Sequence, residues 1–340
     1  MIKVKLGDIC TKQSSNYMQK DLDKLEGEYP VYGASGLIKK IDRYHQDKDY
    51  IAVVKDGAGI GRTMYLPAES SVIGTLQYLI PNAGIDAKYL YYAVKSRHLE
   101  KYYTGATIPH IYFKDYQNEP IIIHRKEQQN QIVFILGEIE KIIEDRKQEL
   151  VCLETLVKAR FIEMFGDPIS NPKGWTRGPL GSRCEIITGN TPSRAEAKNY
   201  GQFIEWIKSD NINTPYTFLT EAQEYLSEIG FQKCRFVESG SLLMTCIAGS
   251  INCIGNVAVA DRRVAFNQQI NAIVPNEDEV LYLYWLMLLS KPAIHRTINM
   301  ALKGILSKGQ LSEMVFPFPP VILQKQFAAF VEQTDKSKVA

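Results

Sequence analysis

The strongest pattern in the chain is helical and lies in its middle. Residues 127–165 contain no proline and a single glycine, Gly137. As a helix, this stretch would be roughly 58 Å long at 1.5 Å per residue. Alternating steps of four and three residues, the spacing of a coiled-coil seam, connect the positions Ile132, Leu136, Ile139, Ile143, Arg146, Leu150, Leu153, Val157, Arg160 and Met164. A single helix cannot bury this stripe, so the pattern predicts a spacer helix with a partner helix, ended by Gly166-Asp167-Pro168.

Two arginines, Arg146 and Arg160, stand within this otherwise apolar series. Their alkyl chains could lie along the edge of the seam while their charged groups reach water. Alternatively, ion pairs made by these arginines could fix the register of two packed helices. The sequence leaves both interpretations open.

On either side of the central helix the apolar spacing is mostly that of strands. Residues 50–54 and 242–245 are short apolar runs with glycines close behind, as expected of buried strands. Residues 86–101 are expected to form a helix with Asp86 near its start. The run from Leu281 to Leu289 is too short to span a bilayer and predicts a buried helix. Each half is therefore expected to be mixed α and β, with more strand than helix.

A second helix is expected at the end of the sequence. Pro319 and Pro320 precede residues 321–340. The spacing of four and three residues continues there, at Phe327, Val331, Thr334 and Lys338. This stretch resembles the start of the central helix in its position after a strand-rich half.

Five short segments of the first half return in the same order in the second half. Residues 6–10 (LGDIC) return at 180–184 (LGSRC), 29–32 (YPVY) at 203–206 (FIEW), 55–61 at 248–255 as glycine-rich hairpins, 79–82 (LIPN) at 273–276 (IVPN), and 89–92 (YLYY) at 282–285 (YLYW). Their shared order favours an internal duplication. The alternative is two independent domains with similar strand patterns.

The composition of the chain limits the number of domains and the kinds of binding site to be expected. A chain of 340 residues with 45% hydrophobic content can form about two domains. Its net charge is only +2, so any nucleic-acid surface must arise from uneven placement of charges. The six cysteines include no C-x-x-C pair, which argues against a structural zinc site and fits reduced thiols in the cytoplasm. No secretory leader or membrane span is expected.

The sequence contains no recognisable catalytic constellation. The glycine-rich segment 55–63 lacks the spacing of a phosphate-binding loop, has Arg62 where lysine is needed, and leads into a strand-like run rather than a helix. Phe318 precedes Pro319-Pro320, so the Asn- or Asp-headed loop of DNA methyltransferases is absent. The five histidines are scattered without ligand spacing. No cofactor or metal is therefore expected in this chain.

Several segments together resemble the specificity (S) subunits of Type I restriction-modification systems. The matching segments are YPVYGASG at 29–36, TGNTPS at 188–193, IEWIKSDNI at 204–212, FNQQI at 266–270, and the Pro-Pro…Gln-x-x-Phe start of the last helix. They extend over nearly the whole chain. The departure is at the C-terminus, where the second spacer helix of that family is normally as long as the first, and about half of it is missing here.

The resemblance implies an α+β fold in which two tandem homologous mixed α/β target-recognition domains are joined by long coiled-coil helices. The expected parts are target-recognition domain 1 (1–124), the central spacer helix (125–165), target-recognition domain 2 (166–320) and a short second spacer helix (321–340). Each domain would read one half of a bipartite, asymmetric site in double-stranded DNA. The helices would hold the domains apart and dock two DNA methyltransferase (M) subunits, and restriction/translocase (R) subunits would join them. S-adenosylmethionine, ATP and magnesium would belong to those partners.

Candidate DNA contacts are the polar and basic residues of the loops, because base edges and phosphates are read by such side chains. They are Tyr32, Ser35, Lys39, Lys55, Arg62, Thr107 and His110 in the first half, and Asn190, Thr191, Ser193, Arg194, Lys208, Asp210, Asn252, Asn267 and Gln268 in the second. Each has an ordinary structural alternative. The segment Thr191-Pro192-Ser193 could be only a turn, and Lys39-Lys40 a solvated pair.

Two other functions remain as alternatives. One is a structural adaptor that binds proteins through its helices and binds no DNA. The other is a DNA methyltransferase or nuclease fused to a recognition domain, which would need a cofactor or metal motif.

The central helix is also expected to bind a further protein surface. The second helix can cover only part of the central stripe, so the chain is expected to self-associate through this helix or to be covered by M subunits.

Overall fold

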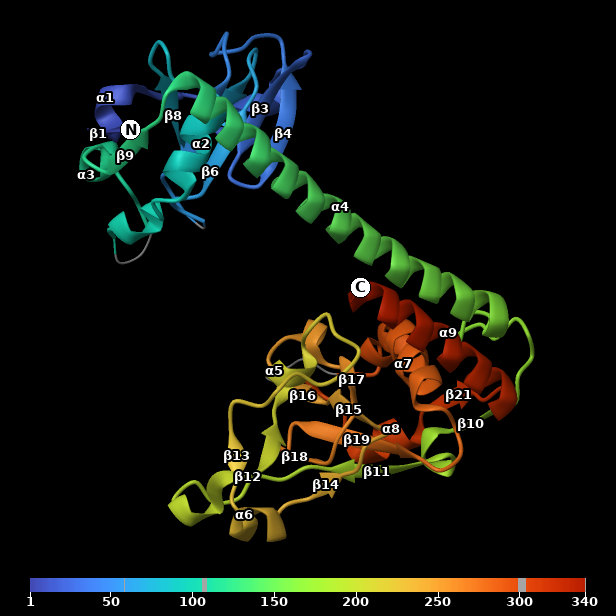
Figure 1. Ribbon diagram of the computed structural model, residues 1–340. Coiled ribbons are helices and arrows are strands. Elements are labelled where there is room, and N and C mark those ends of the chain that lie inside the picture. The colour runs from blue at the N-terminus through green and yellow to red at the C-terminus, as the bar shows by residue number, and fades with distance from the viewer. Residues whose placement is uncertain (58, 106–108, 299–303, 340) are drawn as a thin grey trace. The chain divides into compact units, whose positions relative to one another are not determined.

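The computed structural model describes residues 1–57, 59–105, 109–298 and 304–339. The chain forms two compact units, Met1–Arg146 and Lys147–Ala340 (Figure 1). The two units are tandem domains of the same α+β fold, and the long helix α4 (Lys126–Phe165) contributes residues to both. The predicted fold class is confirmed.

A four-stranded antiparallel sheet forms the centre of the first unit. Its order is β2 (Cys10–Ser14), β8 (Leu76–Pro81), β5 (Tyr50–Val54) and β6 (Thr63–Leu66). Every residue of β5 is buried, because successive side chains point to opposite faces and both faces are covered. Ile51 and Val53 pack into the core on the side of α2 (Ala87–Lys95). Ala52 and Val54 face the second core, beneath the sheet of β3 (Tyr29–Gly33), β4 (Gly36–Ile41) and β7 (Ser71–Val72).

The first and last strands of this unit pair with each other. They are β1 (Ile2–Lys5) and β9 (Pro120–Ile123), which run antiparallel with Ile2 opposite Ile123. The remaining short helices of the unit are α1 (Leu6–Ile9), η1 (Gln19–Lys24), η2 (Leu99–Tyr102) and α3 (Phe113–Tyr116). The unit therefore begins and ends at one place, just before α4.

The second unit repeats this arrangement. Its central sheet has the order β11 (Cys184–Thr188), β19 (Ile270–Pro275), β15 (Ser241–Thr245) and β17 (Val257–Ala260). Its second sheet has the order β13 (Tyr225–Leu226), β12 (Tyr200–Ile207), β18 (Val264–Phe266) and β14 (Phe236–Val237). The predicted buried helix is α7 (Val280–His295), and the first and last strands again pair, as β10 (Arg177–Pro179) and β21 (Val315–Pro317). The shorter elements are η3 (Leu180–Ser182), η4 (Ala197–Asn199), α5 (Ser209–Ile212), α6 (Glu228–Gln232), β16 (Ile247–Ala248), η5 (Ile251–Cys253), β20 (Gly304–Ile305) and α8 (Lys308–Glu313).

Equivalent hydrogen bonds establish which residues of the two units correspond. Cys10 lies opposite Pro81 as Cys184 lies opposite Pro275. The hydroxyl of Tyr89 donates to the Ile122 carbonyl at 2.6 Å, and that of Tyr282 to the Pro317 carbonyl at 2.7 Å. The duplication that the repeated segments predicted is therefore present in the fold.

Two of the predicted correspondences need correction. In the parallel pairs β3–β7 and β12–β18, Val31 corresponds to Trp206, one residue away from the predicted match. The ladders of β3 and β12 are irregular at different positions, which shifts the strands relative to the sequence motif. In the glycine-rich loop, Gly61 correctly matches Gly255, but Lys55 corresponds to Cys246 rather than Ala248, because the second loop is three residues longer.

The central helix begins at Lys126, one residue after the predicted start at 125, and ends where predicted, before Gly166 with φ +80°. Glu140 on its first part accepts hydrogen bonds from Tyr91 (3.2 Å), Tyr92 (2.8 Å) and Lys95 (3.0 Å) of α2. Burial by itself would raise the pKa of Glu140, but these donors lower it below its ordinary value. This end of α4 is thus fixed to the first unit by polar contacts.

The last turns of α4 pack into the core of the second unit. Phe161 stacks on Tyr282 of α7, with ring centroids 5.6 Å apart, and meets Phe327 of α9 (Val321–Val339) edge-on at 5.4 Å. Val157 and Phe165 are buried in the same cluster. Figure 1 shows α9 lying along α7 in this unit.

The predicted seam is therefore correct only in part. Val157 is buried and Met164 packs against the core, but the main contacts of α4 come from Phe161 and Phe165, which the spacing missed. Ile139, Ile143 and Leu150 are 38–50% exposed, so this part of the predicted seam is not buried. Arg160 pairs with Glu163 of its own helix at 2.7 Å and lies over the Phe330 ring, so its ion pair does not join two helices.

The predicted helix over residues 86–101 is shorter than expected. Asp86 does cap it, accepting a hydrogen bond from the Tyr89 backbone N–H at 2.9 Å. However, α2 ends at Lys95, and His98 adopts a left-handed conformation with φ +54° before η2 begins. A left-handed residue cannot continue a right-handed helix, which explains the break.

Phe161→Ala should lower the free energy of unfolding by about 3–5 kcal/mol, because it empties a fully buried aromatic site. The matched control is Phe134→Ala on the same helix, where the ring is 68% exposed and a change within about 0.5 kcal/mol is expected. Urea unfolding of the two variants measures both values. Equal effects would contradict the assignment of Phe161 to the core that holds α4.

Candidate nucleic-acid interface

In the first unit, the predicted contact residues centre on the glycine-rich loop between β5 and β6. Gly57, Gly59 and Gly61 all have positive φ, from +80° to +84°. At Gly61 a Cβ atom would lie 2.3 Å from the backbone nitrogen of Glu100, so only glycine fits. The loop joins two antiparallel strands and no helix follows it. It is a β-hairpin, as predicted, and not a phosphate-binding loop.

Four of the predicted residues lie around this loop. Arg62 donates to the carbonyl of Ala34 at 2.9 Å, so its guanidinium lies at the tight turn between β3 and β4, which also contains the exposed Ser35. His110 Nδ1 lies 2.6 Å from Asp56 Oδ1, and the Ile111 backbone N–H donates to the Lys55 carbonyl at 2.9 Å. We call Ser35, Lys55, Arg62 and His110 the first surface.

The other predicted residues of this unit have supporting contacts. Lys39 donates to the carbonyl of Asp23 at 2.9 Å, so it holds the segment that contains η1. Tyr32 is half-buried and packs against the core beneath β3. Thr107 lies outside the described residues.

In the second unit, two cations lie on aromatic rings. The guanidinium of Arg194 is 5.2 Å from the ring centre of Tyr200 and 5.4 Å from that of Trp206. The ammonium of Lys208 is 5.4 Å from the same Trp206 ring. Such cation–π contacts hold each positive group against an apolar surface.

Glu224 joins the two cations. It pairs with Arg194 at 2.9 Å and also hydrogen-bonds Lys208. The Lys208 ammonium is the main cause of the lowered pKa of Glu224; partial burial opposes it, and Arg194 adds to it. Since the pKa of Glu224 is lowered on folding, this carboxylate is ionised at neutral pH, and its stabilising effect is lost only as the pH falls through that lowered value. One carboxylate between two cations leaves a net positive group.

Polar residues from two loops meet beside this group. The Thr191 hydroxyl hydrogen-bonds the exposed side chain of Gln268. Asn190 donates to the Lys233 carbonyl and accepts from the Arg235 backbone N–H, each at 2.8 Å. Trp206 also donates to the Asn190 carbonyl, at 3.4 Å. We call Thr191, Arg194, Lys208 and Gln268 the second surface.

Asn267 has a structural role in the turn before β19. It is 7% exposed and exchanges hydrogen bonds with Gln269. Gly189 approaches this turn so closely that a Cβ atom would lie 2.2 Å from the Asn267 carbonyl oxygen. The close approach brings the end of β11 and the start of β19 together and so places Thr191 beside Gln268.

The remaining predicted residues lie apart from these contacts. Ser193 is exposed, and its carbonyl accepts from Asn199 at 3.0 Å. Asp210 is exposed in the first turn of α5. Asn252 lies in η5, and its carbonyl accepts from Lys291 at 2.7 Å. By backbone pairing, the equivalent of Arg62 is Asn256 rather than Asn252.

Sequence reasoning missed Tyr200, Trp206 and Glu224. Trp206 lies inside the IEWIKSDNI segment, and in an extended chain an aromatic residue two positions before a lysine shares its face, which is a signal for the contact with Lys208. Glu224 is distant in sequence from both of its partners. No sequence pattern could have identified it.

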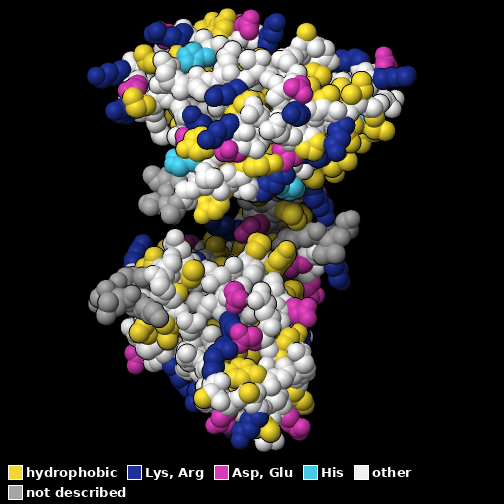
Figure 2. Space-filling view, turned by 90° about the vertical axis from the view of Figure 1, so that its left-hand side faces the viewer, with side chains coloured by type: hydrophobic (Ala, Val, Ile, Leu, Met, Phe, Trp, Pro, Cys, Tyr) yellow, Lys and Arg dark blue, Asp and Glu magenta, His cyan; other side chains and the backbone are white. Residues whose placement is uncertain are grey.

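On the one face that Figure 2 shows, charged side chains are not gathered into one basic patch. On this face, lysine and arginine side chains are interspersed with acidic and apolar ones on each unit (Figure 2). Binding of a polyanion to this face would therefore depend on individual cations, such as those of the first and second surfaces, rather than on an extended positive electrostatic potential.

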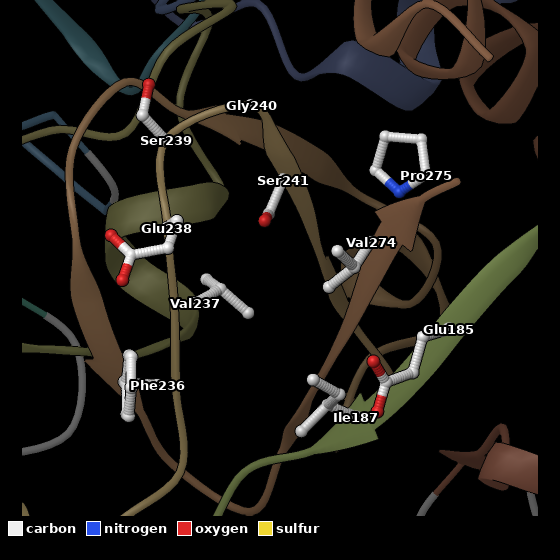
Figure 3. Close-up of a pocket in the computed structure, with 10 residues that line it drawn as sticks. All are labelled: Glu185, Ile187, Phe236, Val237, Glu238, Ser239, Gly240, Ser241, Val274 and Pro275. Carbon is white, nitrogen blue, oxygen red and sulfur yellow. The ribbon is translucent and has the colours of Figure 1, made fainter. Parts of the chain in front are cut away.

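A shallow cleft of about 280 Å³ in the second unit has different chemistry. Figure 3 shows Glu185 and Glu238 on opposite sides of it, with Ile187, Val237 and Val274 between them. None of the predicted contact residues lines it. Glu238 is paired with Arg263 at 2.7 Å, and the lining of the cleft includes no lysine or arginine that could attract a phosphate group, so the cleft is not part of the candidate interface.

Neither a metal site nor a membrane span is found in the described part of the chain. No group of three or more His, Cys, Asp or Glu residues there could hold a metal ion. No helix of the described residues is both long enough and apolar enough to cross a membrane. All six cysteines are free thiols.

Comparisons with known proteins agree with the fold. The sequence profile of the Type I restriction modification DNA specificity domain matches residues 1–152 and 172–340. The Type I restriction enzyme HindI specificity subunit of Haemophilus influenzae is 32% identical over 117 residues, which are 33% of this chain and 24% of that protein. The MjaIX specificity subunit of Methanocaldococcus jannaschii is 27% identical over 176 residues, which are 48% of this chain and 38% of that protein. The aligned parts thus span well under half of these relatives.

Solved structures show the same fold along nearly the whole chain. The S subunit of a Type I restriction-modification system from M. genitalium aligns with a TM-score of 0.65 at 18% identity, over 99% of this chain and 90% of that chain. A chain from a type I R-M system solved in a study of complex assembly gives a TM-score of 0.50 at 15% identity, with the same coverage. Because the specificity-domain profile matches both units, the chain belongs to the Type I restriction modification DNA specificity domain family.

Proposed function

We propose that this chain is the non-catalytic DNA-recognition subunit of a Type I restriction-modification complex and reads a bipartite, asymmetric site in double-stranded DNA. One observation carries the proposal: the two units share a framework but differ in their reading loops. Gly61 corresponds to Gly255, and Pro81 to Pro275. In contrast, Lys55, Arg62 and His110 correspond to Cys246, Asn256 and Ile305. Unlike side chains on a shared framework favour two unlike half-sites.

In this proposal, residues 1–124 and 166–320 are the two target-recognition domains, 125–165 the central spacer helix and 321–340 the second spacer helix. Arginine and lysine of the two surfaces would contact phosphates or guanine, and Thr191, Gln268 and Ser35 would hydrogen-bond base edges. The aromatic faces of Tyr200 and Trp206 would keep the cations Arg194 and Lys208 oriented.

The catalytic reactions would be carried out by the other subunits of the complex. Two DNA methyltransferase (M) subunits would dock on the spacer helices, and restriction/translocase (R) subunits would join them in the cytoplasm. Adenine methylation and ATP-dependent cleavage would belong to those subunits. The exposed apolar positions of α4, such as Phe134 and Ile142, offer surface for such partners.

The proposal predicts that the two units are exchangeable. Replacing residues 1–124 with the first domain of another family member should change one half-site of the methylated sequence and leave the other half-site unchanged. The measurement is a map of methylated sites in cells that co-express the chain with its M subunit. A change in both half-sites, or in neither, would contradict modular reading. Absence of any sequence-specific methylation would favour an adaptor that binds no DNA.

Glu224→Gln should increase non-specific DNA binding, because Arg194 and Lys208 lose the carboxylate that offsets their charge. The slope of log K against log salt for random duplex DNA should steepen by roughly 0.9, the value for one additional phosphate contact. Glu163→Gln is the matched control, since it frees Arg160 on α4, outside the second surface. Equal slopes for the two variants would remove the cation group from the proposed interface.

The isolated chain should self-associate through α4, because Ile139, Ile143 and Leu150 form an exposed apolar stripe on this helix. Burying each such side chain contributes about 1.5–3 kcal/mol. Sedimentation at micromolar concentration should therefore detect oligomers, and Ile143→Lys should shift them toward monomers. Ile229→Lys, at an exposed isoleucine on α6, should not. A clean wild-type monomer would refute this expectation.

A further inference from the structure

Both spacer helices begin with the same buried side chain. The fourth residue of α4 is Gln129, and the fourth residue of α9 is Gln324. They are 2% and 0% exposed, whereas glutamine is normally a surface residue. Neither belongs to the candidate DNA interface. The two units differ at many other positions but have the same buried side chain at the start of the helix that follows each of them.

The two amides make the same pair of hydrogen bonds. Gln129 donates to the His124 carbonyl at 2.9 Å and accepts from the Asp86 backbone N–H at 3.4 Å. Gln324 donates to the Pro319 carbonyl at 2.8 Å and accepts from the Glu279 backbone N–H at 2.8 Å. In each case the carbonyl lies five residues upstream, just before the spacer helix begins.

The accepted N–H group belongs to a second helix in each unit. Asp86 is the N-cap of α2, and Glu279 is the N-cap of α7. The first N–H groups of a helix have no partner within it, so each glutamine satisfies a group that would otherwise be unpaired. One side chain thereby joins the start of the spacer helix to the start of a core helix. We call this arrangement the glutamine bridge.

In the second unit the bridge is reinforced. Gln324 also donates to Asp278 Oδ1 at 2.7 Å. The guanidinium of Arg183 donates two hydrogen bonds to the same carboxylate, at 2.8 and 2.9 Å. Asp278 is buried. Satisfied polar groups inside a core fix one geometry, because any shift leaves a buried group without its partner. The position of the helix start is therefore tightly specified.

Small angles at the start of α4 become large displacements at its end. From Gln129 to Phe165 the helix rises by roughly 54 Å at 1.5 Å per residue. A tilt of about 4° at Gln129 would move the far end by about 3.4 Å, one base-pair step of DNA. The hydrogen bonds of Gln129 direct the first turn of α4 more strictly than non-directional apolar contacts would. The contacts of Glu140 with α2 hold the next turns of the helix.

We propose that Gln129 is a positioning residue that sets the angle at which α4 leaves the first unit, and that it thereby selects the spacing between the two DNA half-sites. Gln324 fixes the start of α9 on the second unit in the same way. This inference rests on the proposed function, because spacing has meaning only if both units bind DNA. The glutamines touch neither bases nor phosphates in this role. Gln129 acts on the number of base pairs between half-sites and not on the identity of the bases.

The test uses the complex of the full chain with its M subunits. Its substrates are duplexes that carry both half-sites, as mapped for the wild type, with the intervening spacer shortened or lengthened by one or two base pairs. Gln129→Met retains the length of the side chain and removes both hydrogen bonds. Gln128→Met is the matched control, because Gln128 is the neighbouring residue on the same helix and is exposed. Gln129→Asn serves as a second variant if the Met variant does not fold.

The preference of the methylation rate for the native spacing should fall by at least about fivefold in Gln129→Met, because the variant loses two hydrogen bonds and one alone corresponds to about this factor. Base preference within each half-site should not change, and Gln128→Met should behave as wild type. A merely stabilising role would lower the rate equally on all spacings and leave the preference intact, which would overturn the inference. If the wild-type complex methylates no bipartite site, the proposed function itself fails, so the two failures are distinguishable.

An independent measurement needs no DNA. Spin labels on Cys152, which is exposed on α4, and on the cysteine of a Lys12→Cys variant report the distance between β2 and the helix. Cys234 and Cys253 are replaced by serine to avoid extra labels. Gln129→Met should broaden the distance distribution relative to Gln128→Met. Identical widths would show that the glutamine bridge does not control the angle of α4.

Discussion

A helix of 40 residues is stable in water only where its side chains gain tertiary contacts. In α4 these contacts differ at its two ends. Near the start, Glu140 is held by Tyr92 and Lys95 through hydrogen bonds and an ion pair. Near the end, Phe161 and Phe165 are enclosed by aromatic rings. The two folded units can be connected in one chain because each supplies a separate set of contacts to the same helix, while the turns between them remain exposed.

Much of this architecture could be predicted from sequence, because it depends on periodicity. The limits of α4, the buried strand β5 and the helix α7 follow from local patterns of apolar residues. The same reasoning failed where tertiary contacts decide. Phe161 lies outside the predicted seam, because its partner is the ring of Tyr282 and not a regular coiled-coil layer. The early end of α2 depends on a single left-handed residue, His98.

The candidate interface was predictable to a smaller extent. The motifs placed Arg194 and Lys208 among the candidates, but not the carboxylate of Glu224 that joins them. Nor did any pattern separate exposed Gln268 from buried Asn267 beside it. Contacts between loops depend on how the strands bring distant segments together, and spacing within one segment contains no information about this. The internal repeat partly replaces that information, since residues retained in both units, such as Gly61 and Gly255, are needed by the framework itself.

The pairing of the first and last strands in each unit has a consequence for chain connectivity. Because β1 lies beside β9, and β10 beside β21, each unit closes upon itself before the next helix begins. Adjacent ends of this kind allow a domain to be inserted into a host protein, or its chain order to be circularly permuted, without breaking its sheets. Each unit is in this sense a cassette: the backbone enters and leaves at one edge, so the order in which cassettes follow one another along a gene is not dictated by the fold.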